Sequence, residues 1–233
     1  RMWRVVENGD DHVTFLLHSP DGDQGYPGAL DMKVTYTLDE ENGLTIHYEA
    51  VPDQDTVINM TNHSYFNLNG HKSGSVLHHR MQLLSDAFTP ADAQSIPTGE
   101  VCSVDGTPMD FRSTKELGAE IDAAYEPLIL GNGYDHNWVL KNEGRFDKVA
   151  EVTGDESGIV MEVWTDRPGV QVYTANFLEN EAGRNGAVYQ KRDAVCLETQ
   201  NYPDAVHQKN FPEAICKKGE TYDTKTAYRF HIE

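Results

Sequence analysis

The strongest pattern along the chain is an alternation of apolar and polar residues with a period of two. Between residues 32 and 50 it runs on both sides of the turn sequence Asp39-Glu40-Glu41-Asn42-Gly43. Successive side chains of a β-strand point to opposite faces, so each run places its apolar residues on one face. Two such runs joined by an Asn-Gly turn predict an antiparallel hairpin with one buried face.

The same alternation recurs in six further segments, which are 12–18, 56–61, 76–84, 159–164, 170–177 and 194–198. Only one short helix is predicted, at 113–121, with Ser113 or Thr114 as N-cap and Glu116 in its first turn. Many strands joined by turns, with almost no helix, predict an all-β fold built as a large antiparallel β-sandwich. Sandwiches of 233 residues commonly stay whole, so residues 1–233 are expected to form a single domain.

Composition and charge narrow the range of partners. The formal net charge is −19, which repels nucleic-acid phosphates and anionic lipid headgroups. No apolar run approaches the roughly 20 residues of a membrane-spanning helix. The three cysteines are scattered, with neither metal-ligand spacing nor a disulfide framework, which favours a reducing cytoplasm. We therefore predict a cytoplasmic protein without nucleic-acid or membrane partners.

One segment, 61–68, combines hydrogen-bonding and aromatic side chains at the end of an apolar run. This mixture suits a sugar ring, because sugar hydroxyls form hydrogen bonds with donors and acceptors and sugar C–H groups pack on aromatic faces. His63 is the residue of the segment that titrates near neutral pH. The alternative for His63 is a hydrogen-bonded structural histidine.

Three more segments carry candidate residues. Asp135 follows a glycine-rich turn and precedes an apolar strand, where a simple turn or cap carboxylate is the alternative. Glu198 ends an apolar strand just before Pro203 breaks the sheet, so partial burial could prepare it as a base; the alternative is a solvated strand-end acid. Gln171 lies on one face of a predicted strand with aromatic neighbours, a pattern that ordinary core and surface packing also produces.

No motif predicts a metal or a cofactor. His78 and His79 are adjacent, so in a strand their rings point to opposite faces and cannot share a metal ion. The acidic loop 21–25 lacks the later ligands of a calcium loop. The sequence also contains no phosphate-binding glycine loop and no nucleophile elbow.

Taken together, the segments resemble one family. TNHSYFNL, FTPADAQSIPTGE, GYDHNWVL, GVQVYTANFL and CLETQNYPDAVH follow one another, and SPDGDQGYPGAL precedes them, in the order typical of the aldose 1-epimerase (galactose mutarotase) family. The resemblance covers essentially the whole chain. It implies a galactose mutarotase-like supersandwich with a central sugar-binding cleft. It also implies interconversion of the α and β anomers of free aldoses such as galactose or glucose, without a cofactor, by a monomer or homodimer.

The resemblance also implies roles for individual residues. His63 matches the acid that serves the ring oxygen, and Glu198 matches the base that takes the anomeric hydroxyl proton. The implied substrate-binding set is His63, Ser64, Tyr65, Asp135, Gln171 and Glu198. The family's sugar-contacting Arg and second His precede the first strand of this sequence. The chain is therefore expected to lack the family's N-terminal segment.

Two other functions remain open at this stage. A non-catalytic carbohydrate-binding sandwich, or an inactive truncated mutarotase, would use Asp135 and Gln171 but would not need a poised pair of His63 and Glu198. A glycoside hydrolase would need two carboxylates about 5–10 Å apart, and the sequence offers one clear candidate, Glu198.

Overall fold

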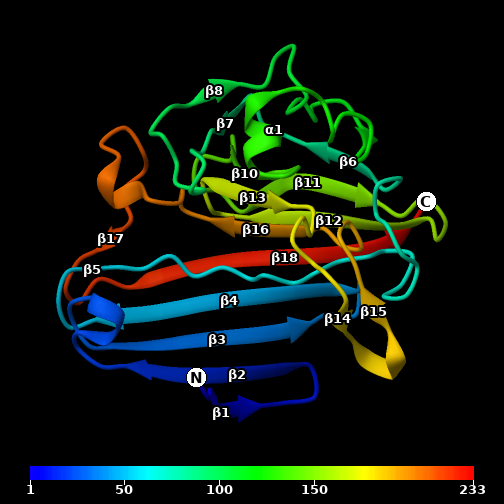
Figure 1. Cartoon of the computed structure of the whole chain (residues 1–233). Helices are drawn as coiled ribbons and strands as arrows, with labels where there is room; N and C mark the ends of the chain where they lie inside the picture. The colour runs from blue at the N-terminus through cyan, green and yellow to red at the C-terminus, as the bar shows by residue number, and fades with distance from the viewer.

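The structure, a computed structural model, describes residues 1–233 as two antiparallel sheets packed on each other (Figure 1). The all-β antiparallel fold predicted from the alternation is confirmed. The larger sheet has nine strands in the order β1-β2-β3-β4-β18-β12-β11-β6-β9, and the smaller has five in the order β16-β13-β10-β7-β8.

The strands of the two sheets have the following bounds. The nine-stranded sheet contains β1 (Arg4–Asn8), β2 (His12–Ser19), β3 (Leu30–Leu38), β4 (Gly43–Pro52), β6 (Arg80–Leu83), β9 (Lys115–Glu116), β11 (Asp147–Thr153), β12 (Ile159–Thr165) and β18 (Tyr222–Ile232). The five-stranded sheet contains β7 (Ala87–Thr89), β8 (Cys102–Ser103), β10 (Asp135–Val139), β13 (Gly169–Tyr173) and β16 (Cys196–Gln200). Two small pairs, β5 (Thr56–Val57) with β17 (Ile215–Cys216) and β14 (Glu181–Ala182) with β15 (Val188–Tyr189), complete the strands. The helical elements are α1 (Glu126–Leu130), η1 (Asp23–Gly25), η2 (Arg184–Gly186) and η3 (Ala205–His207).

The predicted hairpin is present as β3 and β4. Leu38 pairs with Leu44, and Asn42 adopts a φ of 61°, in the left-handed region that Asn tolerates better than most residues. The Asp39 carboxylate accepts the Gly43 N–H at 2.6 Å and the Glu41 N–H at 3.0 Å. The Asp and Asn of the turn sequence thus fix the register that buries one face of the hairpin.

The helix predicted at 113–121 is wrong. Residues 115–116 form β9 at the sheet edge, paired with β6, and the rest of the segment is turns. The N–H groups of Leu117 and Gly118 donate to the carbonyls of His79 and Leu77 rather than to carbonyls within the segment. Leu117 and Ile121 are nevertheless buried, so tertiary contacts outweigh the weak local signal for a helix.

Three predicted strands are shorter than the alternation indicated. The segment 76–84 is paired only over β6. The segment 56–61 pairs only over β5, and 170–177 leaves the sheet after Tyr173, where Ala175 takes a φ of 51°. Beyond its last paired residue, each segment no longer takes part in the regular hydrogen-bond ladder of a sheet. The unpaired ends of 56–61 and 170–177 lie next to the candidate residues.

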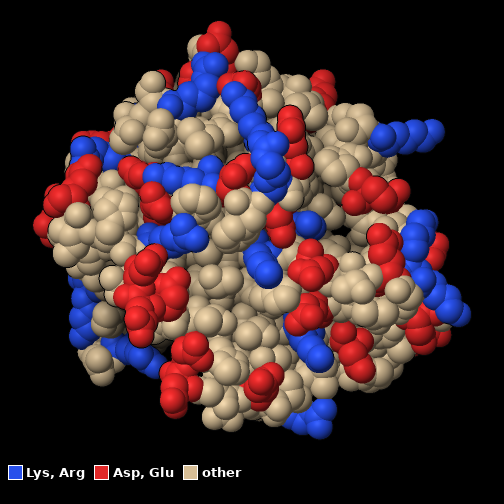
Figure 2. Space-filling view, turned by 180° about the vertical axis from the view of Figure 1, so that it is seen from behind, with Lys and Arg blue, Asp and Glu red and all other residues tan.

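One apolar core joins the two sheets. Its cluster of 31 buried residues includes Trp138 and Leu197 from the smaller sheet and Met161 and Tyr228 from the larger one. The Tyr228 hydroxyl donates to the Leu197 carbonyl at 2.9 Å, which is a direct contact between the layers. On the face drawn in Figure 2, acidic and basic side chains are interspersed rather than gathered into one patch. No helix of the chain is long and apolar enough to cross a membrane.

Candidate functional site

The register of three adjacent strands builds the floor of the site. β13 pairs with β10 on one side and with β16 on the other, so side chains of all three strands stand in rows across the sheet. One row consists of Asp135, Tyr173 and Cys196, and the next consists of Asn137, Gln171 and Glu198. Because strand side chains alternate, both rows lie on the same face.

The opposite face of these strands explains why the site face can be polar. Trp138, Val172 and Leu197 alternate with the site residues and belong to the apolar core. The core therefore holds the sheet in place, and the other face is free to carry amide and carboxyl groups.

His63 reaches this face from a loop. Phe66 and Val195 form an isolated bridge in which each backbone N–H donates to the other residue's carbonyl, with nitrogen–oxygen distances of 2.9 Å, and this bridge ties the loop beside β16. The His63 ring stacks on Tyr65 with centroids 5.1 Å apart and meets Tyr173 edge-on at 5.9 Å. In this position His63 Nε2 lies 3.5 Å from Glu198 Oε1.

These residues share a cavity of about 300 Å³, called here the His63–Glu198 cavity. Its lining residues are His63, Tyr65, Asp135, Gln171, Tyr173, Phe177, Glu198, Gln200 and Pro203. Ser64 is the one residue of the predicted substrate-binding set that does not line it. Tyr173 and Phe177 are the aromatic neighbours that the alternation placed on the strand face of Gln171. Gln200 was not singled out in the sequence, although it is two residues from Glu198 and so lies on the same strand face.

Burial sets the protonation of the two carboxyl groups. Removal from water raises the pKa of Glu198 to about 7, and the neighbouring charge of Asp135 adds to the rise. Burial also raises the pKa of Asp135, while a 2.8 Å hydrogen bond donated by Gln171 Nε2 and the charge of His63 act in the opposite direction. Glu198 is thus poised to exchange a proton near neutral pH.

Several polar atoms at this face are buried without a hydrogen-bond partner. They are Asn137 Oδ1, Gln171 Oε1 and Gln200 Nε2. Such a group costs about 1–3 kcal/mol when it is left unpaired. Gln171 and Gln200 line the cavity, so hydroxyl groups, which both donate and accept, could pair with these two. Tyr65 and Phe177, which are 48% and 63% exposed, add aromatic surface at the rim.

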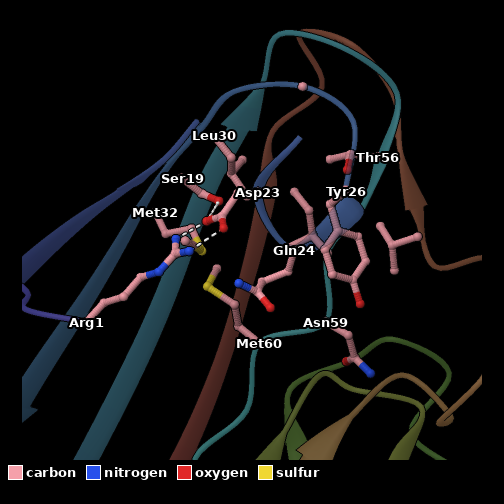
Figure 3. Close-up of a pocket in the computed structure, with 13 residues that line it drawn as sticks. Arg1, Ser19, Asp23, Gln24, Tyr26, Leu30, Met32, Thr56, Asn59 and Met60 are labelled. Carbon is pink, nitrogen blue, oxygen red and sulfur yellow. Dashed lines mark hydrogen bonds and ion pairs between the residues drawn. The ribbon is translucent and has the colours of Figure 1, made fainter. Parts of the chain in front are cut away.

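Two other cavities lack comparable chemistry. The larger, about 510 Å³, shares Tyr65 and runs to Tyr189 beside the β14–β15 pair. The other, about 340 Å³, is drawn in Figure 3, where Asp23 is paired with Arg1 and accepts a 2.6 Å hydrogen bond from Ser19. The smaller of the two is lined by no histidine, and in the larger one His71 Nδ1 is hydrogen-bonded to the Tyr189 hydroxyl at 2.9 Å rather than to a carboxylate.

One cluster in the chain has the composition of a metal site. Ligand atoms of His63, Cys196 and Glu198 all lie within 4.8 Å of one another. The sequence did not predict this arrangement, because His63 is far along the chain from Cys196 and Glu198 and reaches them on a loop that the Phe66–Val195 bridge ties beside β16.

The fold and cavity define a β-sandwich protein whose polar strand face presents an acid–base pair among amide and aromatic side chains. A family model described as aldose 1-epimerase matches residues 1–229. The chain therefore belongs to the aldose 1-epimerase family, as its motifs indicated.

Individual relatives agree with this assignment. The chain is 46% identical over 230 residues to galactose mutarotase of Homo sapiens, covering 98% of this chain and 65% of the relative. It is 37% identical over 236 residues to aldose 1-epimerase of Escherichia coli (strain K12), covering all of this chain and 68% of the relative. The chain thus spans about two thirds of the length of the curated relatives it matches.

Solved structures share the fold. The GalM/aldose epimerase homologue from C. elegans superposes with a TM-score of 0.90 at 29% identity, over 100% of this chain and 69% of the other. Galactose 1-epimerase from Lactobacillus acidophilus NCFM gives a TM-score of 0.83 at 27% identity, over 99% of this chain and 66% of the other.

Proposed function

We propose that this protein is an aldose 1-epimerase, an isomerase that interconverts the α and β anomers of free aldoses such as galactose or glucose. The observation that carries the proposal is the 3.5 Å separation of His63 Nε2 and Glu198 Oε1 in a cavity with amide and aromatic lining. Family membership supports the same reaction, and the relatives' names indicate galactose among the aldoses.

The reaction needs one acid and one base close to a single carbon atom. The anomeric hydroxyl and the ring oxygen are both bonded to C1, so a carboxylate and an imidazolium a few ångströms apart can serve both. The Glu198 carboxylate takes the proton of the anomeric hydroxyl while His63 gives a proton to the ring oxygen, and the C1–ring oxygen bond breaks. Rotation about C1–C2 presents the other face of the aldehyde, and reversed proton transfers close the ring.

The remaining lining residues hold the sugar. Asp135 and Gln171 are joined to each other by a 2.8 Å hydrogen bond and can accept or donate to ring hydroxyls. Burial raises the pKa of Tyr65 to about 12, so its hydroxyl stays protonated and can donate. Ser64 flanks His63 in the loop, and we propose that it acts by shaping the loop.

The first prediction is that Glu198→Gln and His63→Asn each lower kcat at least about 100-fold, because a positioned proton-transfer group contributes that much or more. Both variants remain folded and bind sugar. Initial-rate polarimetry on fresh α-D-galactose and α-D-glucose measures the rate, and circular dichroism checks the fold. If a folded Glu198→Gln protein keeps a rate within about threefold of the parent, then Glu198 is not the base.

The chain supplies a matched control pair. His78 Nδ1 lies 3.1 Å from Glu116 Oε2, so this is also an imidazole–carboxylate pair, but both side chains are mostly exposed and neither lines the His63–Glu198 cavity. His78→Asn and Glu116→Gln should leave the rate unchanged. A parent protein that binds sugar without epimerising it would instead favour the carbohydrate-binding module.

We further propose that the protein is cytoplasmic and acts as a monomer or homodimer. All three cysteines are free thiols, which suits a reducing compartment. Cell fractionation tests the location, and light scattering of the purified chain tests the oligomeric state.

A further inference from the structure

We propose that the His63–Glu198 cavity is also a binding site for a thiophilic divalent cation such as Zn²⁺. The ligands are His63 Nε2, Cys196 Sγ and a carboxylate oxygen of Glu198, and the bound cation blocks sugar turnover. The metal-binding part stands independently of the activity proposed above, whereas the blocking part rests on it.

The geometry needs little adjustment. In a tetrahedral zinc site with bonds of about 2.0–2.3 Å, the ligand atoms lie roughly 3.3–3.7 Å apart. The His63 and Glu198 atoms are already 3.5 Å apart, and the three ligand atoms lie within 4.8 Å of one another. Cys196 is fully buried and does not itself line the cavity, but it lies two residues from Glu198 on the same face of β16, so a cation held by all three ligands sits at the cavity floor. The His63 side chain lies on a loop and is 50% exposed, so among the three ligands it is the one that can shift toward the sulfur.

The charge of the cavity favours a cation. Glu198 and Asp135 both line it, and no Lys or Arg is among its lining residues. The guanidinium of Arg192 is directed elsewhere, donating to Thr174 Oγ1 at 2.9 Å and to the Asn132 carbonyl at 2.7 Å. A cation entering the cavity therefore meets two carboxyl groups and no Lys or Arg side chain.

The ligand set selects the kind of cation. An imidazole nitrogen and a thiolate suit Zn²⁺ or Cd²⁺, whereas Mg²⁺ and Ca²⁺ prefer oxygen ligands only. The Cys196 thiol must release its proton to solvent as the metal–sulfur bond forms. No electron transfer is involved, and the fourth position on the metal remains for water.

Binding would stop the proposed reaction at both of its proton-transfer groups. His63 Nε2 bonded to a metal has no proton to give to a ring oxygen, and a metal-bound Glu198 oxygen is a weak base. The metal here is therefore an inhibitor of the epimerase, and removing it cannot reduce activity.

The test titrates Cd²⁺ into the metal-free 233-residue chain and follows the ultraviolet charge-transfer band of a Cd–thiolate bond. We expect one equivalent to bind, with Mg²⁺ giving no signal. Cys196→Ser, or Cys196→Ala if the serine variant fails to fold, should abolish the band. His63→Asn and Glu198→Gln should each weaken binding by about tenfold or more.

The other two cysteines provide a matched control. Cys102 and Cys216 are not part of the cluster of His63, Cys196 and Glu198, so a Cys102→Ser/Cys216→Ser variant should retain the full band. A band that survives in the Cys196 variants, or disappears in the double variant, would overturn the site.

Polarimetry then separates the two parts of the proposal. EDTA should leave the rate unchanged, Zn²⁺ should inhibit the parent, and each Cys196 variant should be inhibited at least about tenfold less, measured against its own metal-free rate. Full inactivation by EDTA with recovery on metal addition would overturn the inhibitory role. If the band forms at Cys196 in a chain with no epimerase activity, the metal site stands and the proposed function fails.

Discussion

At the scale of single residues, Glu198 shows a conflict between function and stability. Its side chain is only 11% exposed, and burial together with Asp135 raises its pKa to about 7. The rise brings the carboxyl group into the range useful for a base at neutral pH. The raised pKa also means that the buried environment disfavours the ionised form of Glu198. Ionised Glu198 therefore lowers the free energy of unfolding.

Glu198→Gln should therefore stabilise the protein in a pH-dependent way. The folded pKa of about 7 lies above the ordinary value of 4.5, so the parent loses stability as pH rises from 4.5 to 7, while the glutamine variant does not. At 1.36 kcal/mol per pKa unit, the difference above pH 7 is on the order of 3 kcal/mol. Urea unfolding of both proteins at pH 4 and pH 8 measures it. An equal difference at both pH values, or a Glu198→Gln variant that is less stable than the parent at pH 8, contradicts a raised pKa of Glu198. The exposed Glu116→Gln serves as the control.

The sequence predicted individual site residues better than their arrangement. His63, Asp135, Gln171 and Glu198 stand out because polar groups interrupt apolar strands, and all four line one cavity. Cys196 was not among the predicted site residues, because a cysteine within an apolar strand is interpreted as a buried core residue. Its closeness to His63 depends on the loop path after β5, which alternation cannot specify.

At the scale of elements, the site depends on which strands are neighbours. β10, β13 and β16 are far apart along the chain but adjacent in the sheet, and their register aligns Gln171 with Glu198. Local alternation predicts that a strand exists and which face is apolar, as it did for β3 and β4. It carries no information about partners distant in sequence, so pairing of β13 with β16 could not be predicted from the pattern. The wrong helix at 113–121 has the same origin, because pairing with β6 decided its conformation.

The adjacency of β10 and β13 leads to a prediction for Asp135→Asn. The Asp135 charge contributes to the raised pKa of Glu198, so removing it should lower that pKa. The acid limb of the rate profile, where Glu198 becomes protonated, should then move to lower pH. The move should be partial, because burial is the larger cause. Binding should weaken as well, since the proposed role of Asp135 is to hold a hydroxyl.

Rate–pH profiles of the parent and of Asp135→Asn measure this shift. The exposed Asp31→Asn on β3 removes the same charge outside the cavity and should leave the limb where it is. An acid limb that stays in place or moves upward in Asp135→Asn would show that the two carboxyl groups do not interact.

At the scale of the whole molecule, two sheets share one core. The cluster of 31 buried residues draws from both layers, and the Thr199 and Thr226 hydroxyls also hydrogen-bond across them. The apolar faces of both sheets contribute to this one cluster, together with loop residues such as Val104 and Phe111, so neither sheet has a separate large core. This arrangement supports our proposal that residues 1–233 form a single domain, although the chain spans only 65% of the length of its Homo sapiens relative.

Coincident unfolding of the two sheets is the prediction at this scale. Trp138 lies in the smaller sheet, buried in the core, and Trp164 lies in β12 of the larger sheet, stacked under Arg229 with the guanidinium carbon 4.3 Å from the ring centre. In a Trp3→Phe background, Trp138→Phe and Trp164→Phe each leave one reporter. Because a shared core makes unfolding cooperative, the fluorescence of either reporter should follow the same urea curve as far-ultraviolet circular dichroism of the same variant.

Comparison within each variant matters, since Trp138→Phe removes a buried indole that donates to the Met109 carbonyl at 3.0 Å and will lower stability by itself. A Trp164 transition that separates from the dichroism curve would show that the nine-stranded sheet unfolds as an independent unit, and the single-domain proposal would then be wrong.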